Sequence, residues 1–183
     1  MDAFSGLWRR LDTPGHDAAL LMPTETGWAL RGLAVFRHPD GPACVRYAVD
    51  LDPSWRTRSG GVGGFIGARE FGHSIRREPD GWYLDERFIP GLDHLADLDY
   101  GFTPATNLQQ LRRAALKVGQ AADLPAAWFD VDMPTLTELP QRYERRSETT
   151  YWYSAPSGPY EALLEISPSG FVASYPGLWQ MEP

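Results

Sequence analysis

The chain has 183 residues and a mass of 20.5 kDa, a length that suits one domain with a sizeable hydrophobic core. A formal charge of −7 and a pI near 5.0 argue against nucleic acid as a partner, because phosphate binding relies on basic surface. No apolar run approaches the ~20 residues that span a bilayer, the N-terminus lacks a signal-peptide pattern, and the single Cys44 has no disulfide partner. We therefore expect a soluble cytoplasmic protein that does not span a membrane.

Short β-branched and aromatic runs, separated by Gly, Pro and Asp, recur along the chain and predict antiparallel hairpins. Between residues 43 and 51, Val45, Tyr47 and Val49 alternate with polar or small residues and are expected to share one face. The glycine-rich stretch 60–64 matches no phosphate-loop pattern, so it predicts a bulge or a close strand contact. The strands expected in the first half of the chain are residues 28–36, 43–51, 56–66, 71–77 and 82–86.

A single helix is expected near Thr106, where Thr106 or Asn107 could cap the first turn and Leu108, Leu111 and Leu116 form an apolar stripe. Turn residues at 155–159 and 167–170 separate the last strands. No linker or repeat divides the chain, so residues 1–183 are expected to form one domain. The strands expected after the helix are residues 126–131, 135–139, 142–146, 149–154, 160–166 and 171–175.

The densest group of polar residues surrounds Asp97 and Asp99. On a strand these two carboxylates would share one face about 7 Å apart, and their repulsion would raise one pKa, which suits general acid chemistry or hydrogen bonding to sugar hydroxyls. The structural alternative is that they cap turns or pair with Arg112 and Arg113. Two acids on one side of a ligand fit a glycosidase poorly, although Asp50 could supply the opposite face. No metal-binding motif is present, so neither a metal nor a cofactor is expected.

A second polar group lies between Asp50 and Arg58, where Trp55 precedes two arginines, Arg56 and Arg58, that would share a face. These arginines could hold a phosphate or carboxylate headgroup, or they could pair with surface acids. No serine or cysteine nucleophile motif accompanies the four histidines. The tyrosines at 143, 151, 153, 160 and 175 are typical of cross-strand packing and could also line a pocket.

Several sequence blocks, in this order, resemble the bacterial putative glycolipid-binding family, which was first catalogued as a domain of unknown function. The most specific block is 97–107, Asp-Leu-Asp-Tyr-Gly-Phe-Thr-Pro-Ala-Thr-Asn, and the sequence departs from the family after Asn107, where Leu-Gln-Gln-Leu replaces a Leu-Pro-Ile-like stretch. The other blocks are 49–58, 111–113, 127–128, 141–143 and 175–179. The resemblance implies a many-stranded antiparallel sheet curled into an open roll or barrel around a single α-helix, remotely like the lipoprotein localisation factors. It also implies a tight homodimer and an acidic pocket suited to the sugar of a glycolipid.

We therefore predict a mostly β protein that binds a glycolipid or similar sugar-bearing amphiphile without turnover and has a role in glycolipid metabolism. The alternative is a glycoside or ester hydrolase acting on a glycolipid, and a purely structural dimer is a third possibility. No catalytic residue is assigned. The expected ligand-binding residues are Asp50, Trp55, Arg56, Arg58, Asp97, Asp99, Asn107, Arg112, Arg113 and Tyr143.

Overall fold

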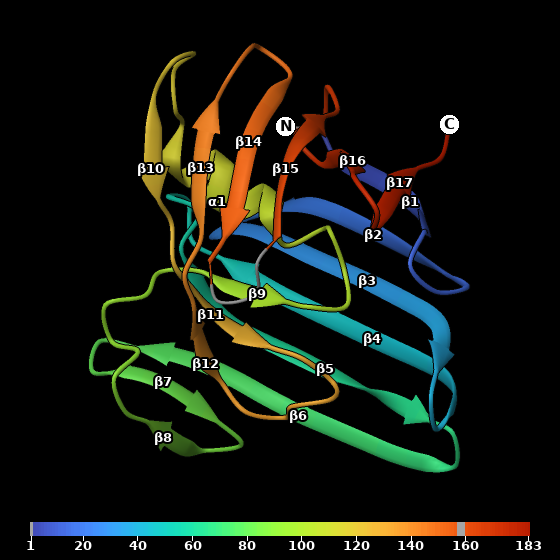
Figure 1. Cartoon of the computed structure of the whole chain (residues 1–183). Helices are drawn as coiled ribbons and strands as arrows, with labels where there is room; N and C mark the ends of the chain where they lie inside the picture. The colour runs from blue at the N-terminus through green and yellow to red at the C-terminus, as the bar shows by residue number, and fades with distance from the viewer. Residues whose placement is uncertain (1, 157–159) are drawn as a thin grey trace.

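The fold is mostly β, as the hairpin pattern predicts. A computed structural model, which describes residues 2–156 and 160–183, contains a fourteen-stranded antiparallel sheet and a three-stranded sheet (Figure 1). The order of the long sheet is β10-β13-β14-β15-β16-β17-β1-β2-β3-β4-β5-β6-β7-β8, and that of the short sheet is β12-β11-β9. Within the described residues β10 and β8, the two ends of the long sheet, do not pair with each other, so the expected roll stays a prediction.

The helix and the strands are numbered in the order of the chain. In the first half they are β1 (Phe4–Arg10), β2 (Gly15–Thr24), β3 (Gly27–His38), β4 (Gly41–Leu51), β5 (Thr57–Ile66), β6 (Arg69–Glu78), β7 (Gly81–Leu84), β8 (Arg87–Ile89) and β9 (Leu98–Tyr100). In the second half they are α1 (Asn107–Ala114), β10 (Ala121–Asp123), β11 (Ala126–Phe129), β12 (Thr137–Leu139), β13 (Arg142–Arg145), β14 (Thr150–Ala155), β15 (Tyr160–Ile166), β16 (Val172–Tyr175) and β17 (Trp179–Met181).

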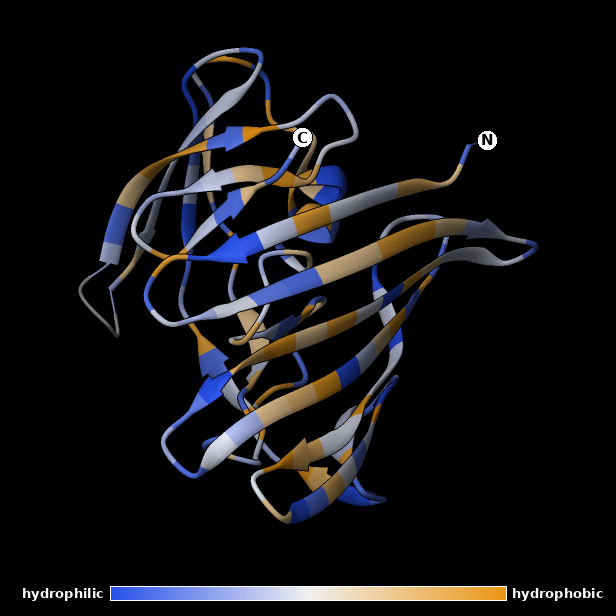
Figure 2. Cartoon of the chain, turned by 90° about the vertical axis from the view of Figure 1, so that its right-hand side faces the viewer, coloured by the Kyte–Doolittle hydropathy of each residue, from blue (hydrophilic) through white to orange (hydrophobic). Residues whose placement is uncertain are grey.

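Alternating side chains give the long strands one buried face. On β4 the side chains of Val45, Tyr47 and Val49 are all buried, which confirms the face predicted for them. Figure 2 shows hydrophobic and hydrophilic segments alternating along the long strands. The steeper strands β13, β14 and β15 cross the direction of β2 to β6 in Figure 1.

The short sheet packs on the long one through β9. The hydroxyl of Tyr100 donates to the backbone carbonyls of Ala48 and Gly61 at 3.1 and 3.2 Å, and the hydroxyl of Thr57 accepts a hydrogen bond from the backbone N–H of Leu98 at 3.0 Å. A Cβ on Gly60 would lie 2.3 Å from Leu98 Cδ2, so this glycine lets β9 approach β5 closely. The predicted close strand contact is confirmed.

The helix begins where the sequence predicts it. Leu108 and Leu111 are buried, as the apolar stripe requires, and the helix ends at Ala114, followed by the C-cap residue Ala115 with a left-handed φ of 46°. Thr106 occupies the N-cap position, but its side chain makes no capping bond, because its hydroxyl donates instead to Asp99. The capping role predicted for this side chain is therefore wrong. No helix in the described part of the chain has the length and apolar character needed to cross a bilayer.

The largest differences from the sequence predictions lie at the N-terminus and in the short strands. Strands β1 and β2 were not predicted, although β2 is ten residues long. The strand expected at 82–86 ends at Leu84, because Asp85 and Glu86 have φ values of 49° and 64° and form the turn into β8. Most of the turn expected at 155–159 lies outside the described residues.

Candidate functional site

The two acids of the 97–107 block both face α1, as a shared strand face predicts. Asp97 is fully buried, and the guanidinium of Arg113 on α1 donates to both of its carboxylate oxygens at distances of 2.6 to 3.1 Å. Burial raises the pKa of Asp97, and the charge and hydrogen bonds of Arg113 oppose that rise. This ion pair ties the last turn of the helix to the residue that precedes β9.

Asp99 has neutral partners instead of a cation. Its Oδ1 accepts a 2.5 Å hydrogen bond from the hydroxyl of Thr106, and its Oδ2 accepts one of 3.2 Å from the side-chain amide of Gln141. Burial is the main cause that raises the pKa of Asp99 to about 6, and the charge of Asp97 adds to it. The expected raised pKa is therefore present, but desolvation contributes more to it than repulsion between the two acids.

A chain of buried amides and hydroxyls continues from Asp99. The amide of Asn107 donates to the hydroxyl of Tyr143 at 2.7 Å, and that hydroxyl donates to Gln141 Oε1 at 3.1 Å. Tyr143 has no exposed surface, so this network fixes the first turn of α1 against β13.

Beside this network lies a cavity of about 220 Å³, named here the inner cavity. Three tyrosines from neighbouring strands, Tyr153, Tyr160 and Tyr175, line it with ring centroids 5.4 to 6.1 Å apart. Trp128 of β11 contributes a half-buried ring from the short sheet. The cavity thus combines aromatic faces with one carboxylate and one amide. Its lining residues are Asp99, Tyr100, Gly101, Thr103, Pro104, Asn107, Trp128, Leu139, Tyr153, Ala155, Tyr160, Tyr175, Leu178 and Trp179.

Only Asp99 and Asn107 of the predicted ligand residues line the inner cavity. Tyr143 lies behind the cavity and bonds the lining residue Asn107, whereas Asp97 and Arg113 pair with each other and do not line the cavity. The sequence indicated that Tyr153, Tyr160 and Tyr175 could line a pocket, and the structure confirms this. From the sequence no such role was expected for Trp128, whose only signal was its place in the block 127–128 that resembles the family.

The remaining predicted residues lie elsewhere. Asp50 is half-exposed and accepts hydrogen bonds from Arg31 at 2.5 Å and from the hydroxyl of Ser59 at 3.1 Å, so the structure does not place it with Asp99 around the inner cavity. Its neighbours on β4, Val49 and Leu51, are buried, and Asp50 points to the opposite face of the sheet.

The arginines of the 50–58 segment do not line the cavity. Trp55 stacks on Trp28 with centroids 4.6 Å apart, and the guanidinium of Arg112 lies 5.7 Å from the ring of Trp55. Arg56 and Arg58 are exposed on either side of the buried Thr57, which agrees with the shared face predicted for them. Burial raises the pKa of Asp97, and the positive charge of Arg56 opposes that rise, though less than the charge and hydrogen bonds of Arg113 do.

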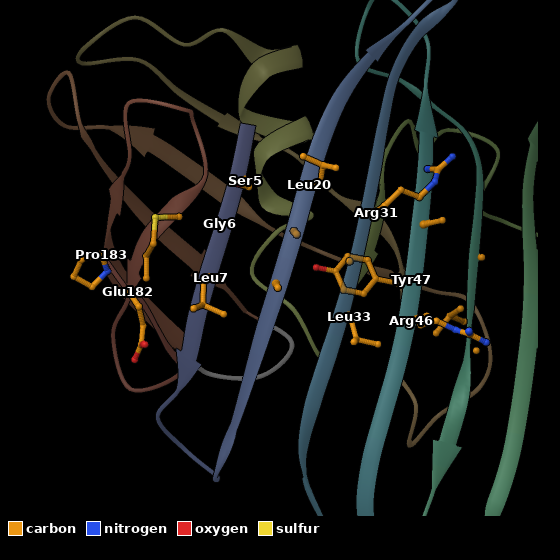
Figure 3. A pocket seen from close by; sticks show the side chains of 18 residues that line it. Ser5, Gly6, Leu7, Leu20, Arg31, Leu33, Arg46, Tyr47, Glu182 and Pro183 are labelled. Atoms are coloured by element: carbon orange, nitrogen blue, oxygen red, sulfur yellow. The ribbon is translucent and has the colours of Figure 1, made fainter. Parts of the chain in front are cut away.

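A larger and mostly apolar depression of about 1090 Å³, named here the outer groove, lies over β17 and β1 to β5. Leu7, Leu20 and Leu33 line its middle and are 38 to 44% exposed. Figure 3 shows Glu182 beyond Leu7 on one side, and Arg31 and Arg46 on the other. Because Arg31 holds Asp50, the acid predicted for the ligand pocket is next to this groove. Over residues 2–156 and 160–183, no three His, Cys, Asp or Glu side chains are grouped as metal ligands would be.

Comparisons with known proteins give one family and one similar solved structure. A family described as "Putative glycolipid-binding" matches residues 6–181 of the chain. A crystal structure of a DUF1089 family protein from Pseudomonas aeruginosa is similar, with a TM-score of 0.70 and 24% sequence identity over 98% of this chain and 92% of that chain. This structural likeness shows a shared fold. No curated protein matches the sequence.

Proposed function

The chain belongs to the putative glycolipid-binding family, and from this membership we propose that it binds a sugar-bearing amphiphile through the inner cavity without turning it over. The observation that carries the proposal is the lining of the cavity, in which tyrosine and tryptophan rings surround the carboxylate of Asp99 and the amide of Asn107. Aromatic faces pack against the apolar faces of a sugar ring, and carboxylate and amide oxygens accept hydrogen bonds from its hydroxyls.

The polar side chains that line the cavity support ligand binding better than they support hydrolysis. A glycosidase needs two carboxyl groups on either side of the scissile bond, about 5–5.5 Å or 6.5–9.5 Å apart. Among the described residues Asp99 is the one acid that lines the cavity, and Asp97 beside it is held by Arg113. This arrangement favours binding of a ligand whose hydroxyl groups donate hydrogen bonds to the carboxylate of Asp99.

We also propose a domain organisation, a sheet shape, an oligomeric state and a cellular role, as expected from the sequence. We propose that residues 1–183 act as one domain, that the long sheet curves as an open roll around α1, and that the protein works as a cytoplasmic homodimer in bacterial glycolipid metabolism. The outer groove is the surface we propose for dimerisation, because its exposed leucines lie between an acidic side and a basic side. A two-fold axis through such a face brings Glu182 of one copy toward Arg46 of the other.

A binding titration with n-octyl β-D-glucoside below its micelle concentration tests the function. Trp128→Ala removes a ring from the cavity and should weaken binding at least tenfold, whereas Trp152→Ala, a half-buried tryptophan on β14 outside the lining, should leave it unchanged. Absence of any binding to octyl glycosides, or equal binding of sodium octanoate, would overturn the proposal. Multiple turnover that Asp99→Asn abolishes would assign the protein to the hydrolases instead.

A further inference from the structure

The inner cavity has a negative charge and no positive charge in its lining. Among the described residues that line it, none is an arginine, a lysine or a histidine, and Asp99 is the one charged side chain. Asp99 is 6% exposed, and both of its side-chain hydrogen-bond donors, Thr106 and Gln141, are neutral. Burial is the main cause of its raised pKa, and the one charge that contributes, that of Asp97, raises the pKa further. No cation of the protein therefore neutralises Asp99.

The charges directly behind the cavity do not change this balance. The hydroxyl of Thr103, which lines the cavity, donates to Asp17, a carboxylate with no exposed surface. Arg113 donates to both carboxylate oxygens of Asp97, so its charge is already paired. The cavity thus lies between two buried acids that have only neutral hydrogen-bond donors.

Arginines on a neighbouring surface are matched by acids. The guanidinium of Arg10 lies 5.3 Å from the ring of Trp179, but it donates to both oxygens of Asp12 at 2.8 and 3.0 Å. Gly101 borders both the inner cavity and a polar depression of about 210 Å³ in which three acids accompany two arginines and a histidine, so the depression supplies no excess of positive charge. The titratable residues of that depression are Arg10, Asp12, Arg37, His38, Asp130 and Asp132.

Aromatic rings line the same space as Asp99. Burial raises the pKa of Tyr153 and of Tyr175, and the negative charge of Asp99 adds to both rises, so this carboxylate acts on the rings around it. The negative face of an aromatic ring attracts a cation, most strongly where water is excluded. The aromatic residues of the lining are Tyr100, Trp128, Tyr153, Tyr160, Tyr175 and Trp179.

The other polar side chains of the lining offer acceptors. Asn107 donates from its amide to the hydroxyl of Tyr143 at 2.7 Å, and its carbonyl oxygen remains an acceptor. The hydroxyl of Thr103 donates to Asp17, so it does not donate to a ligand. A primary ammonium has three N–H donors, a positive charge and no acceptor. This group matches both the acceptors and the uncompensated charge of the cavity.

We propose that the group bound in the inner cavity carries a primary ammonium, so that the ligand is an amino sugar on an alkyl chain. This inference rests on the proposed function and names the class of sugar. A buried carboxylate without a cation is costly, and a ligand ammonium neutralises it, whereas a neutral sugar leaves the charge in place. An anionic sugar would face Asp99 with no cation in the lining. The cavity therefore selects a cationic sugar over a neutral or an anionic one.

The test compares four ligands with one alkyl chain at pH 7, where Asp99, with a pKa of about 6, is mostly ionised. They are n-octyl β-D-glucoside, n-octyl 2-amino-2-deoxy-β-D-glucoside, n-octyl β-D-glucuronide and n-octylamine, each below its micelle concentration. The amino glucoside should bind more tightly than the glucoside by about tenfold or more, and the glucuronide should bind less tightly than the glucoside.

Variants assign the preference to Asp99 and to the rings. Asp99→Asn keeps the size of the side chain and should remove the difference between the amino glucoside and the glucoside. Glu161→Gln, the same loss of charge at an exposed position on β15 outside the lining, should keep that difference. Tyr160→Leu removes a half-exposed ring and should lower the preference for the amino glucoside, and Tyr160→Phe, which keeps the ring, should restore it.

The outcomes separate this inference from the proposed function. If the glucoside binds and the amino glucoside binds no more tightly, the ammonium inference is wrong and the proposed function stands. If the preference survives Asp99→Asn, the assignment of the ammonium to Asp99 is wrong. If n-octylamine binds as tightly as the amino glucoside, the sugar is not recognised, and the amino-sugar class and the proposed function are both overturned. The same holds if none of the four ligands binds.

Discussion

Asp97 and Asp99 are two residues apart and have different roles because their partners differ. Arg113 neutralises Asp97 through two parallel hydrogen bonds, so replacing Asp97 would leave a guanidinium without its partner and loosen the helix. Asp99 accepts side-chain hydrogen bonds from the neutral groups of Thr106 and Gln141 and lines the inner cavity. Of the two, Asp99 is the acid available to a ligand.

Asp17 is a third buried carboxylate, and it lies outside every region that the sequence singled out. Its oxygens accept hydrogen bonds from the hydroxyl of Tyr47 at 2.9 and 3.1 Å and from the hydroxyl of Thr103 at 2.5 Å. It has no exposed surface and forms no ion pair within residues 2–156 and 160–183. Burial raises its pKa from 3.8 to about 6.

This raised pKa predicts that the protein loses stability as the pH rises from about 4 to about 6. The folded state keeps the proton of Asp17 up to pH about 6, whereas the unfolded chain releases it near 3.8, so the folded state binds more protons in this window and the free energy of unfolding falls. The fall for this one group is on the order of 2–3 kcal/mol. Urea denaturation between pH 4 and pH 7 measures it.

Asp17→Asn supplies the control, because a neutral amide has no proton to release. Its free energy of unfolding should change less over the same window, and the remaining slope should reflect the other buried acids, Asp99, whose pKa is also raised to about 6, and Asp97, whose pKa is also raised. Equal slopes for the variant and the wild type would show that Asp17 does not titrate in this range.

At the scale of elements, α1 depends on its surroundings. A helix of eight residues is too short to be stable alone in water, so tertiary contacts hold it. Three side chains of its own sequence make these contacts: Asn107 bonds Tyr143, Gln109 bonds the backbone carbonyl of Leu98, and Arg113 bonds Asp97. The helix is therefore fastened to β9 and β13 along its whole length.

The packing of β9 on β5 depends on Gly60. Gly60→Ala should destabilise the protein by about 1–3 kcal/mol, because the added methyl group would overlap Leu98 Cδ2 and lie 2.7 Å from the hydroxyl of Tyr100. Gly72→Ala on β6 is the matched control, since nothing lies within 4 Å of a Cβ there, and it should be neutral or slightly stabilising. Thermal unfolding of both variants decides the prediction, and equal melting temperatures would contradict it.

At the scale of the whole molecule, the outer groove is a mostly apolar depression of about 1090 Å³ on the surface of the long sheet. Eighteen residues line it, close to the roughly 20–30 residues that each partner contributes to a stable interface. The leucines in its middle would be buried by a second copy, and the charged sides are complementary under two-fold symmetry.

Leu20→Asp therefore should convert the proposed dimer to a monomer, because it places a charge in the middle of the buried apolar patch. Light scattering at micromolar concentration should give about twice 20.5 kDa for the wild type and 20.5 kDa for the variant. Leu163→Asp, at a leucine 45% exposed on β15 away from the groove, should leave the dimer intact. A monomeric wild type would remove the groove from consideration as an interface.

The sequence by itself determined the local features of this protein. Alternation on β4 fixed which side chains are buried, the Pro-Asp-Gly sequences at 39–41 and 79–81 ended the strands, and the stripe of Leu108 and Leu111 located the helix. The short β8, β9, β10 and β17 have three residues each, too few for a periodic pattern, and were missed for that reason.

Only the tertiary structure decided which polar residues come together. Asp50 and Asp99 are similar in sequence context, yet strand register sends Asp50 to the face of Arg31 and Asp99 to the face of α1. The inner cavity joins β11, β14, β15 and β16 to the block that contains Asp99, and these segments are separated by tens of residues. Local periodicity reports which face of one strand is buried, but it carries no information on which distant strands share that face, and that pairing builds the site.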